Sequence, residues 1–440
     1  MKDALKKILI FILEAEAKLV LKKYKPRIIA ITGSVGKTST KDAVYAVLSK
    51  FYYVRKSEKS FNSEIGLPLT ILGCPNAWSN LWPWVKNIIY GLELILMKHE
   101  YPEWLVLEIG ADKPGDIKRV SRWLYADAVV ITRIGKTPVH IEFYNSLAQL
   151  VEEKASLLKS AKTDGLVILN ADDEVVADLK NKTKNRVMTY GFNEEADMQA
   201  SNMQVLYKKN DNPPAGGEET PDGILFRINY DGNSLPVAIE GAFGQNHVYS
   251  ALVGLSVANG LSLNMVTAAE ALKSYETPPG RNKLIEGVKN TLIIDDTYNS
   301  SPVAAEAAVK TLDELKIKKR ARKIAVLGDM LELGRHTDEM HKELGKIASK
   351  VADILVTVGP RARLIAEGAL NYEFPENKIF QYDDSRSAGK FVEGIIKDGD
   401  IILVKGSQGV RMERAVEEIM AHPENKESLL VRQDPEWSRR

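Results

Sequence analysis

One stretch near the start of the chain constrains the fold more than any other: IIAITGSVGKTSTKDAVYAVL, which begins at Ile28. It reads as an apolar strand, a glycine turn and a helix that opens with a lysine and hydroxyls. In such a cradle, backbone N–H groups and the helix N-terminus receive phosphates. The strict pattern G-x-x-x-x-G-K-[ST] fails because Ile31 stands six positions before the lysine, so the loop is a shorter form. The predicted phosphate-binding residues are Gly33, Ser34, Gly36, Lys37, Thr38 and Ser39.

The overall composition is that of an ordinary globular chain. Its 440 residues are enough for two or three domains. Lysine and arginine total 60 against 59 aspartates and glutamates. This nearly even charge balance does not indicate a nucleic-acid binder. The single cysteine, Cys74, excludes an internal disulfide and a multi-cysteine metal site.

Apolar strand-like runs alternate with helical patterns along most of the chain, which predicts an α/β fold. Residues 185–240 read as a β-rich excursion with a mobile loop, NDNPPAGGEETPDG, and the Pro/Gly break ETPPGRNK reads as a hinge. We predict a P-loop central ATPase domain on a parallel sheet, followed by a C-terminal Rossmann-like doubly wound α/β domain. The predicted boundaries are 1–25 for an N-terminal amphipathic helix, 26–279 for the central domain and 280–440 for the C-terminal domain.

Two segments contain more apolar residues than a solvent-exposed surface usually does. The first 25 residues have basic ends, but their uninterrupted apolar run covers only Ile8 to Leu13, too short to span a bilayer. A second segment holds four of the six tryptophans, Trp78, Trp82, Trp84 and Trp104. Packing on the ATPase core is the favoured interpretation of both segments, and contact with a membrane surface stays the alternative.

Several polar residues stand where a parallel sheet presents side chains to ligands. Glu108 ends one apolar strand and suits a magnesium contact, while His140 follows the next strand. Lys154, on a helix, is unremarkable alone. Beyond the hinge, Arg281 and Asp296 could clamp a nucleotide held by the first half. The remaining candidates lie at strand-to-helix turns that suit a carboxylate or phosphate: Asn299, Lys405, Ser407 and Arg411.

Eight motifs occur together and in order: ITGSVGKTST, FNSEIGLPLT, LEIGADKPGDI, LNADDE, PPGRNK, DDTYNSSP, AVLGDMLELG and LVKGSQGVRMER. This set resembles the Mur ligase family, and within it the MurF type, which joins D-alanyl-D-alanine to UDP-N-acetylmuramoyl-tripeptide. The similarity covers roughly residues 25–420. Such proteins usually begin with a domain that binds the UDP-sugar, whereas here the phosphate loop already starts at Thr32 and a short amphipathic helix precedes it.

The resemblance implies an ATP- and Mg²⁺-dependent amide ligase that works through an acyl phosphate, and it implies a role for each matching residue. Lys37 and Thr38 would hold phosphate and magnesium, and Glu108 and His140 would serve the metals. Lys154 falls where the family often carries a carbamylated lysine. The remaining roles are adenine contact by Asn246 or His247, closure over the nucleotide by Arg281 and Asp296, and contact with the incoming substrate by Asn299, Ser407 and Arg411.

The departures from the family pattern keep other functions open. Arg133 replaces an asparagine and Gln408 an arginine, although the phosphate-handling residues are all present. The leading hypothesis is D-Ala-D-Ala addition to the peptidyl wall precursor in peptidoglycan synthesis, by a cytoplasmic monomer that binds no nucleic acid. One alternative is an amide ligase of the same family acting on a different acceptor, such as another wall polymer, a polyglutamate-like chain or a membrane-held precursor. Another is a non-catalytic nucleotide-binding scaffold at a membrane, and peripheral contact with the inner face of the membrane stays open for each.

Overall fold

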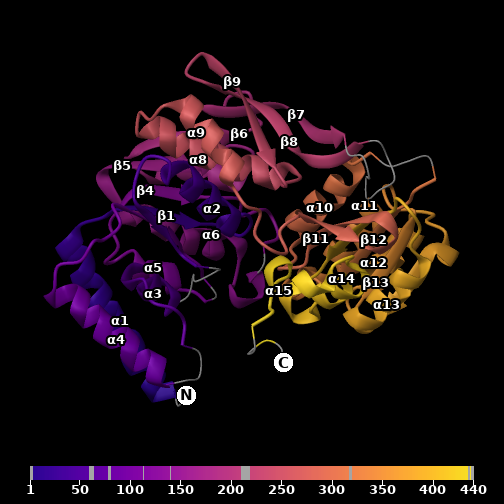
Figure 1. Cartoon of the computed structure of the whole chain (residues 1–440), viewed down its shortest axis with the longest axis horizontal. Coiled ribbons are helices and arrows are strands. Elements are labelled where there is room, and N and C mark those ends of the chain that lie inside the picture. Colours follow the sequence, from indigo (N-terminus) through magenta and orange to yellow (C-terminus); the bar gives the residue numbers. More distant parts are fainter. Residues whose placement is uncertain are drawn as a thin grey trace.

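The computed structural model describes residues 3–58, 64–77, 81–111, 113–138, 140–209, 219–316, 320–434 and 437. The chain forms two α/β halves, each built on its own sheet, that face each other across the hinge (Figure 1). The mobile loop expected near residue 215 falls largely on residues 210–218, which lie outside the described residues, as does Trp78.

The first half is built on a nine-stranded sheet in the order β2-β3-β1-β4-β5-β6-β7-β8-β9. Its parallel part, from β2 to β6, contains the phosphate loop after β1, and β7 to β9 form the predicted β-rich excursion as an antiparallel extension. The strands are β1 (Arg27–Thr32), β2 (Val54–Lys56), β3 (Trp104–Glu108), β4 (Ala126–Ile131), β5 (Ala161–Asn170), β6 (Arg186–Gly191), β7 (Met198–Lys209), β8 (Glu219–Tyr230) and β9 (Asn233–Glu240).

Helices cover both faces of this sheet and bury its central strands. One face packs against α2 (Lys37–Leu48), α8 (Gln245–Gly260) and α9 (Met265–Ala271). The hydrophobic core on the other face takes residues from α1 (Asp3–Tyr24), α3 (Gly66–Leu72), α4 (Leu81–Leu96), α5 (Asp116–Val120), α6 (Leu147–Ala155) and α7 (Glu174–Ala177). One side of α1 therefore lies on the core of the first half.

The second half is a six-stranded sheet in the order β10-β11-β15-β12-β13-β14, parallel except for the antiparallel pair β10–β11. Its strands are β10 (Lys283–Gly287), β11 (Thr291–Asp296), β12 (Lys323–Gly328), β13 (Ile354–Val358), β14 (Ile379–Tyr382) and β15 (Ile401–Lys405). Helices cover both of its faces: α10 (Pro302–Glu314), α11 (Thr337–Ala348), α12 (Arg363–Leu370), α13 (Ser385–Ile395) and α14 (Glu413–Ile419), with α15 (Lys426–Leu429) near the C-terminus. This arrangement confirms the predicted fold class.

Candidate active site

The phosphate loop is held open by hydrogen bonds to the neighbouring strand. The backbone N–H groups of Ser34 and Val35 both donate to the carbonyl of Arg133, at 2.8 and 3.1 Å. Gly33 adopts a φ of +149°, and a Cβ atom there would lie 1.9 Å from Oγ1 of Thr132. Gly36 is left-handed, with a φ of 86°, and caps α2. Only glycine fits the first position, and the turn aims the N-terminus of α2 at the loop.

Two lysines from different helices converge on one carbonyl of this loop. Nζ of Lys37 and Nζ of Lys154 each donate to the carbonyl oxygen of Gly33 at 3.0 Å. Lys154 reaches it from α6 and is 4% exposed. The phosphate-binding turn thus has concentrated positive charge beside the N-terminus of a helix, which favours an anionic ligand.

A hydroxyl and a carboxylate meet at the mouth of the loop. Thr38 Oγ1 donates to Glu108 Oε2 at 3.0 Å, since β1 and β3 are neighbours and Ile31 pairs with Glu108. Nη2 of Arg281, from beyond the hinge, lies 3.4 Å from the same hydroxyl. A hydroxyl and a carboxylate are the hard oxygen ligands that Mg²⁺ takes together with phosphate oxygens and water, so these residues fit the metal.

His140 connects the two halves of the molecule. Its backbone is left-handed, with a φ of 66°, and its Nδ1 lies 2.5 Å from Oε2 of Glu332. Glu332 belongs to the GDMLELG motif of the second half, and the His140 ring lowers the pKa of its carboxyl. The motif supported the resemblance, but no role was predicted for Glu332.

These groups line a cavity of about 320 Å³ between the halves. Lys37, Glu108, His140 and Arg281 line it together with the loop. The second half contributes Tyr298, Asn299, Ser300, Ser301, Ala304 and Gln408. The lining combines cations, hydroxyls and backbone N–H groups, which suits a polyphosphate chain and a second polar substrate.

In the second half, Asp296 and Lys405 form a buried ion pair at 2.6 Å, and Lys405 also donates to the carbonyl of Asn299 at 2.9 Å. Ser407 Oγ accepts from the N–H of Leu331 at 2.9 Å and lies 3.3 Å from the carbonyl of Ser300. Two predicted substrate residues, Asn299 and Ser407, therefore lie with Lys405 in one hydrogen-bonded cluster.

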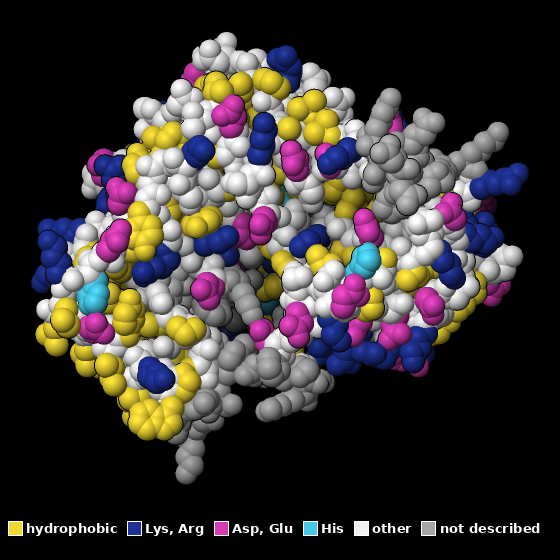
Figure 2. Space-filling model, in the orientation of Figure 1, with side chains coloured by type: hydrophobic (Ala, Val, Ile, Leu, Met, Phe, Trp, Pro, Cys, Tyr) yellow, Lys and Arg dark blue, Asp and Glu magenta, His cyan; other side chains and the backbone are white. Residues whose placement is uncertain are grey.

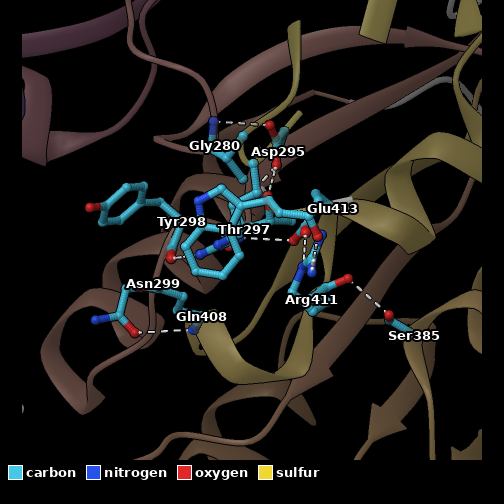
Figure 3. A network of polar contacts seen from close by, with 12 residues as sticks. Gly280, Asp295, Thr297, Tyr298, Asn299, Ser385, Gln408, Arg411 and Glu413 are labelled. Atoms are coloured by element: carbon cyan, nitrogen blue, oxygen red, sulfur yellow. Dashed lines mark hydrogen bonds and ion pairs between the residues drawn. The ribbon is translucent and has the colours of Figure 1, made fainter. Parts of the chain in front are cut away.

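Arg411 does not line that cavity, but it lies close to Tyr298, Asn299 and Gln408, which do (Figure 3). Its Nε is 2.5 Å from Glu413 Oε1, and its guanidinium lies over the ring of Trp437. Arg432 contacts the other oxygen of Glu413 at 2.8 Å and the carbonyl of Thr297 at 3.2 Å. Arg432 and Trp437, near the C-terminus, thus pack beside the site.

Of the two residues predicted to face adenine, His247 is engaged elsewhere in this structure. Its Nδ1 lies 2.8 Å from the Tyr275 hydroxyl and its Nε2 lies 2.8 Å from the carbonyl of Arg281. Burial lowers its pKa to about 4, so the ring is neutral. His247 anchors the hinge to α8, and its contact with a nucleotide stays a prediction, as does that of Asn246.

This geometry defines a class of protein. A phosphate loop with an adjacent lysine, a hydroxyl and a carboxylate that fit magnesium, and a second α/β half that lines the same cavity form the site of an ATP-dependent phosphoryl-transfer enzyme.

The sequence comparison identifies the family. The chain matches the Mur ligase middle domain over residues 31–82 and 86–253, and the Mur ligase, glutamate ligase domain over residues 280–408. The chain belongs to the Mur ligase family, whose members are ATP-dependent ligases. This assignment confirms the predicted resemblance to the Mur ligase family. It also confirms the predicted enzyme class, an ATP-dependent ligase, and the predicted use of ATP and Mg²⁺.

Individual relatives agree with this assignment. The UDP-N-acetylmuramoyl-tripeptide–D-alanyl-D-alanine ligase of Bacillus subtilis is 30% identical over 412 residues, which cover 93% of this chain and 79% of the relative. The Escherichia coli enzyme of the same name is 26% identical over 398 residues, 89% of this chain and 76% of that one. The crystal structure of MurF ligase from Thermotoga maritima in complex with ADP superimposes with a TM-score of 0.74 at 25% identity, covering 93% of this chain and 83% of that one.

Proposed function

We propose that this chain joins D-alanyl-D-alanine to UDP-N-acetylmuramoyl-tripeptide in peptidoglycan precursor synthesis. The observation that carries the proposal is the shared cavity, in which Lys37 and Glu108 of one half face Arg281 and Asn299 of the other. The curated relatives of that name, similar over most of the chain, support the choice of substrates.

The reaction proceeds in two steps. A carboxylate oxygen of the tripeptide attacks the γ-phosphorus of ATP, the bond to ADP breaks, and ADP leaves with the electron pair. The amine of the dipeptide then attacks the acyl carbon, the C–O bond to phosphate breaks, and the amine loses a proton. Mg²⁺, when bound, neutralises charge on the phosphate oxygens. Water must be excluded, because an acyl phosphate hydrolyses easily.

The chain's own residues supply binding, orientation and charge. Lys37 and the N-terminus of α2 would hold the phosphates, and Thr38, Glu108 and His140 would serve the metal. Lys154 is the candidate for carbamylation. Arg281 and Asp296 would close over the nucleotide, and Asn246 or His247 would face the adenine. Asn299 and Ser407 would receive the dipeptide carboxylate, and Arg411 would join them only after leaving Glu413 and the Trp437 ring. We assign these roles to two domains, 26–279 and 280–440, that close on each other, with 1–25 as an added helix.

The enzyme acts in the cytoplasm as a monomer, and α1 and α4 bring it to the inner face of the membrane. Among the described residues, no helix is long and apolar enough to cross a membrane.

Phosphate release from ATP and Mg²⁺ tests the reaction. Release that requires both UDP-N-acetylmuramoyl-tripeptide and D-Ala-D-Ala is expected. Release with another carboxylate–amine pair but not with this one would contradict the assigned substrates and indicate a ligase with a different acceptor.

A lysine substitution tests the site. Lys37→Ala should lower the turnover number by about 10²–10³-fold, because charge on the transferring phosphoryl loses its nearest cation. Lys50→Ala, at an exposed position after α2, is the matched control and should leave turnover unchanged. Equal activity of both variants would exclude the assigned role of Lys37.

A further inference from the structure

Helices α1 and α4 expose large apolar side chains that no described residue covers. The exposed fraction is 74% for Phe11, 73% for Trp82 and 81% for Leu96. On α4 the exposed residues recur every three or four positions, so they form one stripe along the helix. We call the following set the α1–α4 surface: Ile8, Phe11 and Leu19 on α1, with Trp82, Val85, Ile89, Leu92 and Leu96 on α4.

This surface is preformed by the fold. The C-terminal ends of the two helices are joined, since Nζ of Lys23 and the hydroxyl of Tyr24 donate to the carbonyl of Leu94 at 2.8 and 2.9 Å. Further along the pair, Gly91 packs so closely that a Cβ there would lie 2.3 Å from Oε2 of Glu16. The helices therefore run parallel and side by side at the edge of the molecule (Figure 1).

The apolar residues gather where these helices lie, at the lower left of the space-filling view (Figure 2). The opposite sides of both helices pack into the hydrophobic core, where Leu13 and Val20 of α1 and Trp84 and Leu94 of α4 are buried. The exposed stripes are thus additional to what folding requires. Exposed apolar surface of this extent, rimmed by polar groups, marks an interaction site.

Charge identifies the occupant. Lys7 and Lys22 are exposed on α1, and they stand four and eleven positions from Phe11, on the same side of the helix. Lys18 is paired with Glu14 at 2.7 Å and is not counted with them. Lys86 is exposed beside Val85 on α4. A second copy of the chain would bring this lysine rim against its own like charges, whereas an anionic lipid surface complements it.

We propose that the α1–α4 surface docks the enzyme on an anionic lipid bilayer, with both helices lying in the plane of the interface. Trp82, Ile89 and Leu96 enter the headgroup boundary, and the lysines extend their ammonium groups to the lipid phosphates. This inference extends the proposed peripheral location and does not depend on which peptide is the substrate.

Vesicle flotation of the full chain tests the proposal. The wild-type protein should float with vesicles of phosphatidylglycerol and phosphatidylcholine, less with pure phosphatidylcholine, and less again in 0.5 M salt. The triple variant Trp82→Ser, Ile89→Ser, Leu96→Ser should partition at least about tenfold more weakly, since it removes three apolar side chains from the contact. The charge variant Lys7→Glu, Lys22→Glu, Lys86→Glu should bind anionic vesicles less than the wild type does. Its binding to pure phosphatidylcholine vesicles should equal that of the wild type.

The matched control removes exposed apolar side chains elsewhere. Val266→Ser with Leu370→Ser alters residues that are 54% and 42% exposed and lie outside the surface, and it should float as the wild type does. Failure of the wild type to bind anionic vesicles, or equal binding by the triple variant, would overturn the proposal. So would a dimer in lipid-free solution that the triple variant dissociates, because the surface would then bind a second copy.

Phosphate release with water-soluble substrates, measured without vesicles, keeps the two proposals apart. The triple variant should release phosphate at the wild-type rate, because no residue of the α1–α4 surface lines the active-site cavity. Vesicle binding without ligase activity would contradict the proposed function only, and activity without vesicle binding would contradict the docking surface only.

Discussion

Glu16 is a buried acid on α1. It is 4% exposed between α1 and α4, and neither of its oxygens has a hydrogen-bond partner among the described residues. Burial raises its pKa to about 7 from an ordinary 4.5. The folded protein therefore binds a proton there that the unfolded chain releases, and the ionised form destabilises the helix pair.

Substitution of Glu16 should show this in the pH dependence of stability. Because the folded pKa is raised, the wild type should lose stability as pH rises from about 4.5 to 7 and stay at the lower value above that. Glu16→Gln cannot ionise and should be more stable than the wild type at pH 8 by about 1–3 kcal/mol. Denaturant unfolding at pH 5 and pH 8 measures both proteins.

Glu103→Gln, on the loop before β3, serves as the control at an exposed position. An equal stability difference between wild type and Glu16→Gln at both pH values would contradict a raised pKa at Glu16.

At the scale of elements, the sequence predicted the strands and helices whose apolar residues are buried and regularly spaced. The phosphate loop, the parallel strands around it and the alternation in the second half are all confirmed, because buried strands appear as continuous β-branched runs. The strands β10 and β14 and the helix α13 were not predicted. Both strands are short, lie at the edges of their sheet and mix polar with apolar residues, and α13 is polar over most of its length.

The sequence predicted which residues belong to the site better than it predicted which of them contact one another. Asp296 meets Lys405 because β11 and β15 are neighbours in a register that places these two residues side by side. That strand order follows from a long crossover, which local patterns do not encode. Likewise, Glu332 reaches His140 only because the two halves pack together, so tertiary structure alone joins these groups.

The phosphate loop depends on one glycine. Gly33→Ala should lower stability by about 1–3 kcal/mol and weaken ATP binding, because its Cβ would overlap the Thr132 side chain that donates to the carbonyls of Thr32 and Val35. Thermal unfolding and nucleotide titration measure the two effects. Gly394→Ala, within α13, brings the added methyl within 4 Å of no atom beyond its own helix and chain neighbours, so it should not lower stability and should gain up to about 1 kcal/mol from helix propensity. Unchanged nucleotide affinity in Gly33→Ala would show that the loop tolerates the overlap.

For the whole molecule, the central question is what holds two separately built halves in contact around the site. Arg281 crosses to Thr38, and Glu332 crosses to His140. Both crossing contacts involve polar groups that a nucleotide or its metal would also engage. Under the proposed function, closure and substrate binding share these residues, and the contact between the halves should respond to ligand.

The Glu332 contact gives the test at this scale. Glu332→Gln should raise the KM for the incoming amine by up to about fivefold, because a partly exposed ion pair contributes about 0.2–1 kcal/mol to the closed state. Because the His140 ring lowers the pKa of the Glu332 carboxyl, the stabilisation that the ionised carboxylate contributes is lost as pH falls through this lowered folded pKa. Steady-state kinetics in low and high salt should show the difference between variant and wild type shrinking as salt screens the pair.

Glu367→Gln removes another exposed ion pair, with Lys342 at 2.6 Å, but entirely within the second half, so its KM should equal that of the wild type. If both variants raised the KM equally, the effect would come from general charge loss and not from the contact between the halves. If Glu332→Gln lowered the turnover number and left KM unchanged, Glu332 would act on the chemical step through His140, and closure would rest on Arg281.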